Sequence, residues 1–206
     1  MPHKVNDPAF WAKRLSNNKL EPHKAVYDID EDTWHRIWTS LSEILYRFLV
    51  PGMKVLDAGC GHGNLVSAIP SLSPPVEYTG IDLVPAFVNI ARNKHPQHTF
   101  LIRDMSCLPE FTDGYFDLCI VSSIEAMIRN NCGNAKWEQI ESELRRISKS
   151  LLLTEYDVAG PGVVSYRTIR LASYSGLLPG EHITPYSSLY WYEDATGYIV
   201  WRKGSG

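Results

Sequence analysis

The alternation of strand-like and helix-like segments over residues 51–158 is the feature that most constrains the fold. Short apolar, β-prone runs occupy residues 53–59, 76–83, 98–104, 115–123 and 150–158. Helical patterns fall between several of these runs, at 64–69, 84–95 and 134–150. Strands that alternate with helices in this way predict an α/β fold, with a parallel sheet covered on both faces.

The two ends of the chain have different patterns. Residues 30–49 place apolar side chains at helical spacing, so they predict an amphipathic helix ahead of the sheet. Residues 162–176 also predict a helix. Residues 187–203 alternate polar and apolar side chains around a turn, which is typical of a hairpin and predicts antiparallel pairing at the C-terminus.

Composition narrows the class of protein. The chain has 206 residues, 44% of them hydrophobic, and a net charge of −3, so it has no basic excess to attract nucleic acid. The four cysteines form no CxxC pair, which favours reduced thiols in a cytoplasmic protein. No apolar run approaches bilayer length, so we expect no membrane association. The oligomeric state cannot be inferred from these features.

A glycine-rich segment, VLDAGCGHGNL at residues 55–65, follows the first predicted strand. Glycine loses the most backbone freedom on folding, so three in five positions indicate unusual dihedral angles or a close approach to another group. The carboxyl end of a strand in an open parallel sheet is where ligands bind. A dinucleotide fingerprint would have a third glycine at the position of Asn64, and Asp57 would place negative charge near a pyrophosphate.

The segment instead resembles the cofactor loop of class I S-adenosylmethionine-dependent methyltransferases, and the resemblance extends from about Val55 to Asp157. It implies a Rossmann-like domain over residues 51–206 and an N-terminal helical extension over residues 1–50 that serves as a lid, together one compact domain. The expected architecture is a doubly wound, mostly parallel seven-stranded sheet with an antiparallel C-terminal strand.

The resemblance also implies cofactor contacts at four successive strand ends. Asp82 would receive the ribose hydroxyls and Asp104 the adenine amino group, while Asp57 would lie near the cofactor's ammonium group. The full set implied to bind S-adenosylmethionine, or its product S-adenosylhomocysteine, is Asp57, Gly59, Gly61, Gly63, Asp82, Leu83, Asp104, Met105 and Ser122.

The methyl acceptor is less constrained. The stretch SSIEAM, which begins at Ser122, replaces the Asp/Asn-Pro-Pro-aromatic tetrapeptide expected of nucleic-acid amino-methyltransferases. FWAKRL, with Trp11 three residues before Arg14, resembles the lid of small-molecule methyltransferases of the thiopurine type. A small-molecule acceptor is therefore preferred, with a protein side chain second. The candidate substrate-pocket residues are Trp11, Tyr27, Ser123, Glu125 and Tyr156.

Several alternatives stay open. No residue is assigned as a catalytic base, although His23, His35 and Asp157 are also candidates for contact with the acceptor. No metal is expected. The competing functions are a catalytically silent, methyltransferase-like binding subunit, a nucleic-acid methyltransferase and a nicotinamide-dependent reductase.

Overall fold

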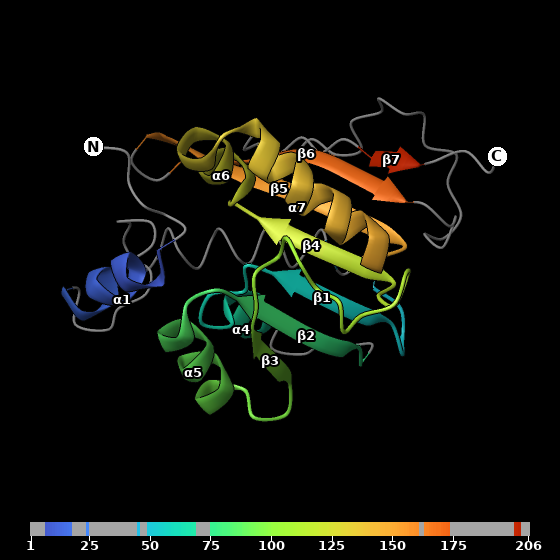
Figure 1. Ribbon diagram of the computed structural model, residues 1–206, viewed down its shortest axis with the longest axis horizontal. Helices are drawn as coiled ribbons and strands as arrows, with labels where there is room; N and C mark the ends of the chain where they lie inside the picture. The colour runs from blue at the N-terminus through green and yellow to red at the C-terminus, as the bar shows by residue number, and fades with distance from the viewer. Residues whose placement is uncertain are drawn as a thin grey trace.

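The computed structural model describes residues 7–17, 24, 45, 49–68, 75–160, 163–173 and 200–202, with side chains as far as residue 153. Its centre is a parallel sheet (Figure 1) made of β1 (Lys54–Ala58), β2 (Glu77–Asp82), β3 (Thr99–Ile102), β4 (Leu118–Ser122) and the first half of β5 (Ser150–Gly160). These five strands lie in the order β3-β2-β1-β4-β5, and each pairs with its neighbours in parallel. The predicted α/β, doubly wound core is confirmed.

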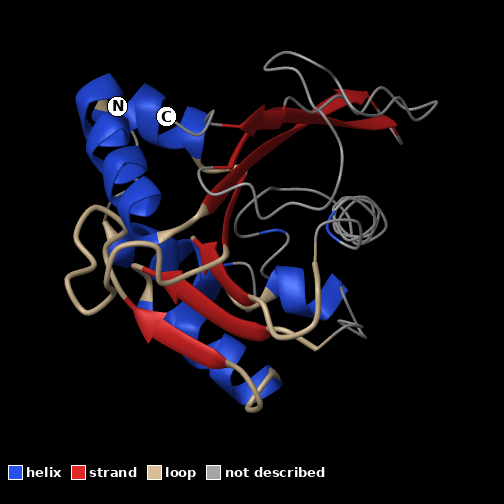
Figure 2. Cartoon of the chain, turned by 90° about the vertical axis from the view of Figure 1, so that its right-hand side faces the viewer, coloured by secondary structure: helices blue, strands red, loops and turns tan. Residues whose placement is uncertain are grey.

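Helices cover both faces of this sheet. α4 (Asn64–Ala68) and α5 (Pro85–Lys94) follow β1 and β2, whereas α6 (Glu125–Cys132) and α7 (Asn134–Ile147) join β4 to β5. The strand order reverses between β1 and β4, so right-handed crossovers place the two pairs of helices on opposite faces. Figure 2 shows the resulting layers, with α6 and α7 on one side of the strands.

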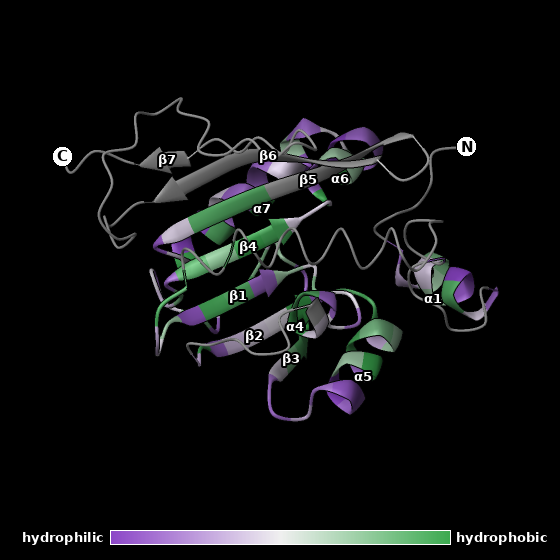
Figure 3. Ribbon diagram, turned by 180° about the vertical axis from the view of Figure 1, so that it is seen from behind, coloured by the Kyte–Doolittle hydropathy of each residue, from purple (hydrophilic) through white to green (hydrophobic). Residues whose placement is uncertain are grey.

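The burial of apolar side chains explains why these segments form strands and helices. All five residues of β4 are buried, and in Figure 3 β4 and most of β1 have the colour of apolar residues, as strands covered on both faces require. The face of α7 that packs on the sheet is the predicted one, made of Trp137, Ile140, Leu144 and Ile147. Pro85 lies in the first turn of α5, as predicted.

The C-terminal part corrects one prediction. Residues predicted as a helix over 162–176 form instead β6 (Val163–Ser173), which pairs antiparallel with β5. The stretch VVSYRTIRLAS is rich in β-branched and aromatic residues, and the exposed edge of β5 supplies a partner for them. β7 (Val200–Arg202) then pairs in parallel with β6. The first strand of the predicted hairpin lies outside the described residues.

The N-terminal part is described over α1 (Pro8–Asn17). The helix predicted over 30–49 lies almost entirely outside the described residues, but Leu45 is helical and fully buried. Among the residues that the structure describes, no helix has the length and apolar character needed to cross a bilayer.

Candidate functional site

The glycine loop lies at the carboxyl end of β1, beside the point where the strand order reverses. Gly59, Gly61 and Gly63 have φ values of +85°, +54° and +83°, a region that other residues rarely adopt. The amides of Gly59 and Cys60 both donate to the carbonyl of Ile81, at 2.8 and 2.9 Å, so the end of β2 fixes the start of the loop.

Two of the three glycines also leave room for neighbouring side chains. A Cβ at Gly59 would lie 1.8 Å from Cδ1 of Ile124, and one at Gly63 would lie 2.9 Å from the His95 ring. At Gly61 the nearest atom would be the Asn64 amide nitrogen, at 3.6 Å. Gly59 therefore lets the loop after β4 pack directly on the loop after β1, while Gly61 has space beside it.

Asp82, at the end of β2, is bound to the same loop. Its Oδ2 accepts from the Gly61 amide at 2.9 Å, and its Oδ1 accepts from the Val84 amide at 2.8 Å. Burial raises the pKa of this carboxyl group, and the backbone hydrogen bonds oppose the shift. The sequence predicted a ligand contact for Asp82 but not this second role, in which it sets the position of the glycine loop.

Asp57 lies beneath the loop. Its carboxyl group is only 4% exposed, and its Oδ2 accepts from the Tyr78 hydroxyl at 2.5 Å. Burial raises the pKa of Asp57 to about 7; the Tyr78 hydrogen bond opposes this shift and the charge of Asp82 adds to it. Tyr78 was not predicted as a site residue, because its place in an alternating strand is equally typical of a core residue.

Asp104 begins the loop that follows β3. Its Oδ1 accepts from the amide and the hydroxyl of Ser106, at 2.8 and 2.7 Å, and its side chain is 49% exposed. Lys136 of α7 donates to the Ser106 hydroxyl at 2.7 Å. Met105, the neighbouring predicted cofactor residue, packs its side chain against the buried core that includes Trp137 and Leu144 of α7.

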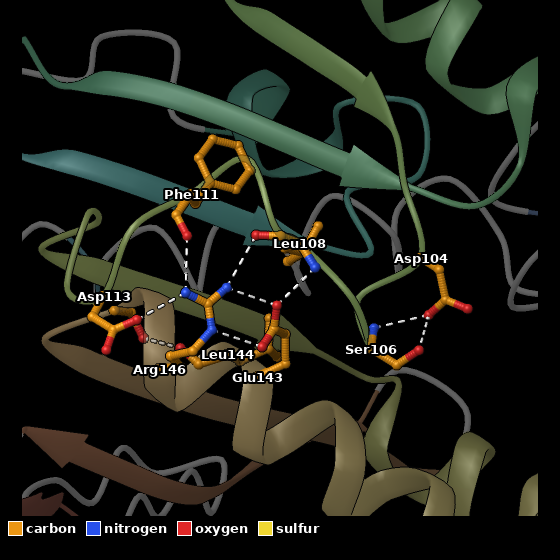
Figure 4. A network of polar contacts seen from close by, with 9 residues as sticks. Asp104, Ser106, Leu108, Phe111, Asp113, Glu143, Leu144 and Arg146 are labelled. Atoms are coloured by element: carbon orange, nitrogen blue, oxygen red, sulfur yellow. Dashed lines mark hydrogen bonds and ion pairs between the residues drawn. The ribbon is translucent and has the colours of Figure 1, made fainter.

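Arg146 and Glu143 of α7 hold the rest of this loop (Figure 4). Arg146 donates to the carbonyl oxygens of Leu108 and Phe111, at 3.1 and 2.9 Å, and pairs with Asp113 and Glu143. Glu143 accepts from the Leu108 amide at 2.7 Å. The spacing of Glu143 and Arg146 predicts a pair within one helix, but it gives no sign that both reach a distant loop.

The end of β4 brings together three more of the predicted residues, Ser122, Ser123 and Glu125. The hydroxyl oxygens of Ser122 and Ser123 and Oε2 of Glu125 are buried with no hydrogen-bond partner among the described residues. The second oxygen of Glu125 accepts from Arg129 at 2.7 Å. Ser123 is the one non-glycine residue of the described chain with positive φ, at 59°. Strain of this kind occurs often at functional sites.

Helix α1 packs against α5, the helix that follows β2. Trp11 and Leu15 form a cluster with Val84 and Phe87, and Met127 of α6 packs against the same cluster. The rings of Trp11 and Phe87 lie 6.5 Å apart. Helix α1 therefore lies against α5, next to the carboxyl end of β2.

Other predicted residues cannot be placed in this arrangement. Tyr27, His23 and His35 lie outside the described residues, as do the side chains of Tyr156 and Asp157 in β5. Asp117, which was not among the predicted site residues, has a structural role, since it accepts from the Lys54 amide and from Lys149 at the amino end of β1. Within the described residues, no three His, Cys, Asp or Glu side chains gather as potential metal ligands.

Comparison with known proteins agrees with this geometry. Residues 55–150 match the model of a methyltransferase domain. A phthiotriol/phenolphthiotriol dimycocerosates methyltransferase from Mycobacterium leprae is 32% identical over 108 residues, which are 52% of this chain and 35% of that protein. The chain thus spans about a third of the length of such curated relatives.

Solved structures share the fold. A protein from Pyrococcus horikoshii has a TM-score of 0.55 at 21% identity, over 69% of this chain and 66% of its own. A magnesium protoporphyrin IX methyltransferase from Synechocystis, crystallised with S-adenosylmethionine, has a TM-score of 0.53 at 18% identity, over 80% and 81%. Residues 55–150 therefore match a methyltransferase domain, and the core of the chain has the fold of these solved structures.

Proposed function

We propose that this chain binds S-adenosylmethionine at the carboxyl ends of β1 to β4 and transfers its methyl group to a small molecule. One observation carries the proposal. Asp57, Asp82 and Asp104 stand at three neighbouring strand ends, around a glycine loop whose backbone a ligand can approach.

The residues at the site suit this cofactor. Its ribose hydroxyls, ammonium group and adenine amino group are all hydrogen-bond donors, and carboxylates are acceptors. A dinucleotide would instead bring a pyrophosphate to these acids. The buried hydroxyls of Ser122 and Ser123 offer further polar contacts at the end of β4. This set favours S-adenosylmethionine over a nicotinamide cofactor.

Each part of the site has a role in the proposed reaction. Asp82 orients the glycine loop and accepts from the ribose, Asp104 and Met105 hold the adenine, and Asp57 attracts the ammonium group. When bound, the cofactor supplies a methyl group on a positively charged sulfur, which is a good leaving group. The protein mainly aligns the acceptor with this methyl group, and such alignment contributes up to about 7–11 kcal/mol to lowering a barrier.

A small-molecule acceptor is supported by two features. The mycobacterial relatives are methyltransferases of phthiotriol-type compounds. Helix α1 packs against α5 beside the site, which supports a role for residues 1–50 as a lid that excludes water, with Trp11 on the acceptor side. Ser123, Glu125, Tyr27 and Tyr156 remain our candidates for acceptor contact.

Two further features belong to the same proposal. The complete sheet has seven strands, with antiparallel pairing at the β5 edge, which the pairing of β6 with β5 supports. A cytoplasmic location is supported by four free cysteines, Cys60, Cys107, Cys119 and Cys132.

Calorimetric titration with S-adenosylhomocysteine tests the cofactor assignment, with Gly61→Arg as the control that fills the open space beside the loop. Binding by the wild type alone supports the assignment, and NAD titrated in parallel should show no heat. Transfer of a labelled methyl group is then measured on small-molecule, protein and RNA panels. Uptake by RNA alone would overturn the acceptor class, and cofactor binding without uptake in any panel would favour a silent binding subunit.

A further inference from the structure

Ser106 fixes the orientation of the Asp104 carboxylate. Both the amide and the hydroxyl of Ser106 donate to Oδ1 of Asp104, at 2.8 and 2.7 Å, and Figure 4 shows these two bonds. Neither bond uses Oδ2. The turn therefore holds Oδ1 toward Ser106, while Oδ2, which Lys136 approaches to 3.7 Å, keeps lone pairs for an incoming donor.

Lys136 determines the direction of the serine hydroxyl. Its ammonium group donates to the Ser106 oxygen at 2.7 Å, and an ammonium has no lone pair with which to accept. The single hydroxyl hydrogen of Ser106 therefore points to Asp104, so the three side chains form a directed chain from Lys136 through Ser106 to Asp104. Hydrogen bonds in such a chain strengthen one another. Lys136 also lies 3.7 Å from Oδ2 of Asp104.

We propose that Lys136 and Ser106 are positioning residues that hold Asp104 as an obligate acceptor, so that the site selects a 6-aminopurine over a 6-oxopurine. This inference rests on the proposed function, which places the adenine beside Asp104. An ionised carboxylate can accept from the 6-amino group of adenine, whereas the 6-oxo oxygen of hypoxanthine would face it as a second acceptor.

The electrostatics agree with this assignment. Burial alone would raise the pKa of Asp104, but the hydrogen bonds from Ser106 and the charge of Lys136 outweigh burial and lower it. Asp104 therefore stays ionised, and unable to donate to a 6-oxo group, throughout the neutral range.

The loop itself does not depend on this chain of three residues. Arg146 and Glu143 bind the later part of the loop at Leu108 and Phe111. Lys136 and Ser106 take no part in these contacts. Variants at positions 106 and 136 should therefore change the orientation of Asp104 while the loop stays attached to α7.

The test is calorimetric titration of the full chain with S-adenosylhomocysteine and with S-inosylhomocysteine, its 6-oxo analogue. The wild type should prefer the 6-amino ligand by about tenfold or more, which corresponds to about 1.4 kcal/mol. Ser106→Ala should reduce this preference at least about threefold, and Lys136→Met should also reduce it. Ser106→Thr and Lys136→Arg, which keep the hydroxyl and the charge, should restore it.

The preference between ligands, rather than either affinity, is the decisive readout. If Ser106 and Lys136 only stabilise the loop, both affinities will fall together and the preference will not change, which would overturn the inference. A wild type that binds both ligands equally would also overturn it while leaving the proposed function intact. A wild type that binds neither would overturn the proposed function as well.

Discussion

Tyr78 donates its hydroxyl hydrogen to the Asp57 carboxylate across 2.5 Å, in a position where both side chains are 4% exposed. The two residues come from adjacent strands, since Val55 of β1 is in register with Tyr78 of β2. Burial raises the pKa of both groups, that of Asp57 to about 7. The pair therefore places a carboxyl group that titrates near neutrality directly under the glycine loop.

The stability of the ligand-free protein should depend on this titration. Between the unfolded pKa of 3.8 and the folded value of about 7, Asp57 holds its proton in the folded chain but not in the unfolded chain. Its contribution to stability is therefore full below pH 3.8 and is lost as pH rises through 7, by about 2 kcal/mol between pH 5 and pH 7. Urea denaturation of the wild type and Asp57→Asn at pH 5, 6, 7 and 8 measures the difference. Parallel pH profiles for the two proteins would show that Asp57 does not titrate in this window.

The affinity for S-adenosylhomocysteine should change in the opposite direction. If Asp57 attracts the ammonium group of the ligand, only its ionised form does so, and that form increases about tenfold between pH 6 and pH 8 for a pKa near 7. Calorimetry should show affinity rising with pH in the wild type and constant in Asp57→Asn. A wild-type affinity independent of pH would place the ammonium group away from Asp57.

Asp82 offers a way to separate loop position from ligand contact. Asp82→Ala removes the acceptors for both the Gly61 and the Val84 amides, so it should weaken ligand binding by more than a ligand contact alone, at least about tenfold. Asp82→Asn keeps one acceptor oxygen and should retain more affinity. Amide exchange at Gly61, measured without ligand, should accelerate in Asp82→Ala. Unchanged affinity in Asp82→Ala would contradict the placement of the ribose at Asp82.

The succession of strands and helices along residues 53–158 and the position of the glycine loop could be predicted from the sequence, because both depend on local patterns. Trp137 and Leu144 repeat at helical spacing and lie on one buried face of α7, as expected. The assignment of 162–176 as a helix was wrong, because its pairing with the edge of β5 depends on residues distant in sequence.

The polar contacts of the site were harder to predict for the same reason. Asp57, Asp82 and Asp104 could be selected because they lie near the ends of predicted strands, where the resemblance to methyltransferases implies cofactor contacts. Their partners Tyr78 and Lys136 could not, since a tyrosine in a strand and a lysine on a helix are ordinary features of a core and a surface. Lys136 is 30 positions from Ser106, so only the packing of α7 on the loop reveals the contact.

Arg146 should hold the loop that follows β3 through contacts that its neighbour Arg145 does not make. Arg146 donates to two loop carbonyls, whereas Arg145 pairs with Glu141 within α7. The Leu108 amide donates to Glu143, which Arg146 holds by an ion pair, so Arg146→Met should increase hydrogen exchange at this amide by about tenfold or more and reduce ligand affinity. Arg145→Met is the matched control and should change neither. Equal effects of the two substitutions would mean that the loop is held by other contacts.

Gly59 and Gly61 should differ in what an added methyl group disrupts. Both have positive φ, so alanine costs about 1–2 kcal/mol of conformational energy at either position. Only at Gly59 does the new Cβ collide with a neighbour, at 1.8 Å from Ile124 Cδ1, so Gly59→Ala should lower the free energy of unfolding by about 1 kcal/mol more than Gly61→Ala. Urea denaturation measures this difference, and the double variant Gly59→Ala, Ile124→Ala should recover part of it. Ligand binding should not follow stability. If S-adenosylhomocysteine approaches the loop at Gly61 as proposed, Gly61→Ala should lose affinity for it despite its milder effect on folding. If Gly61→Ala binds as tightly as the wild type, the cofactor does not approach the loop at that residue.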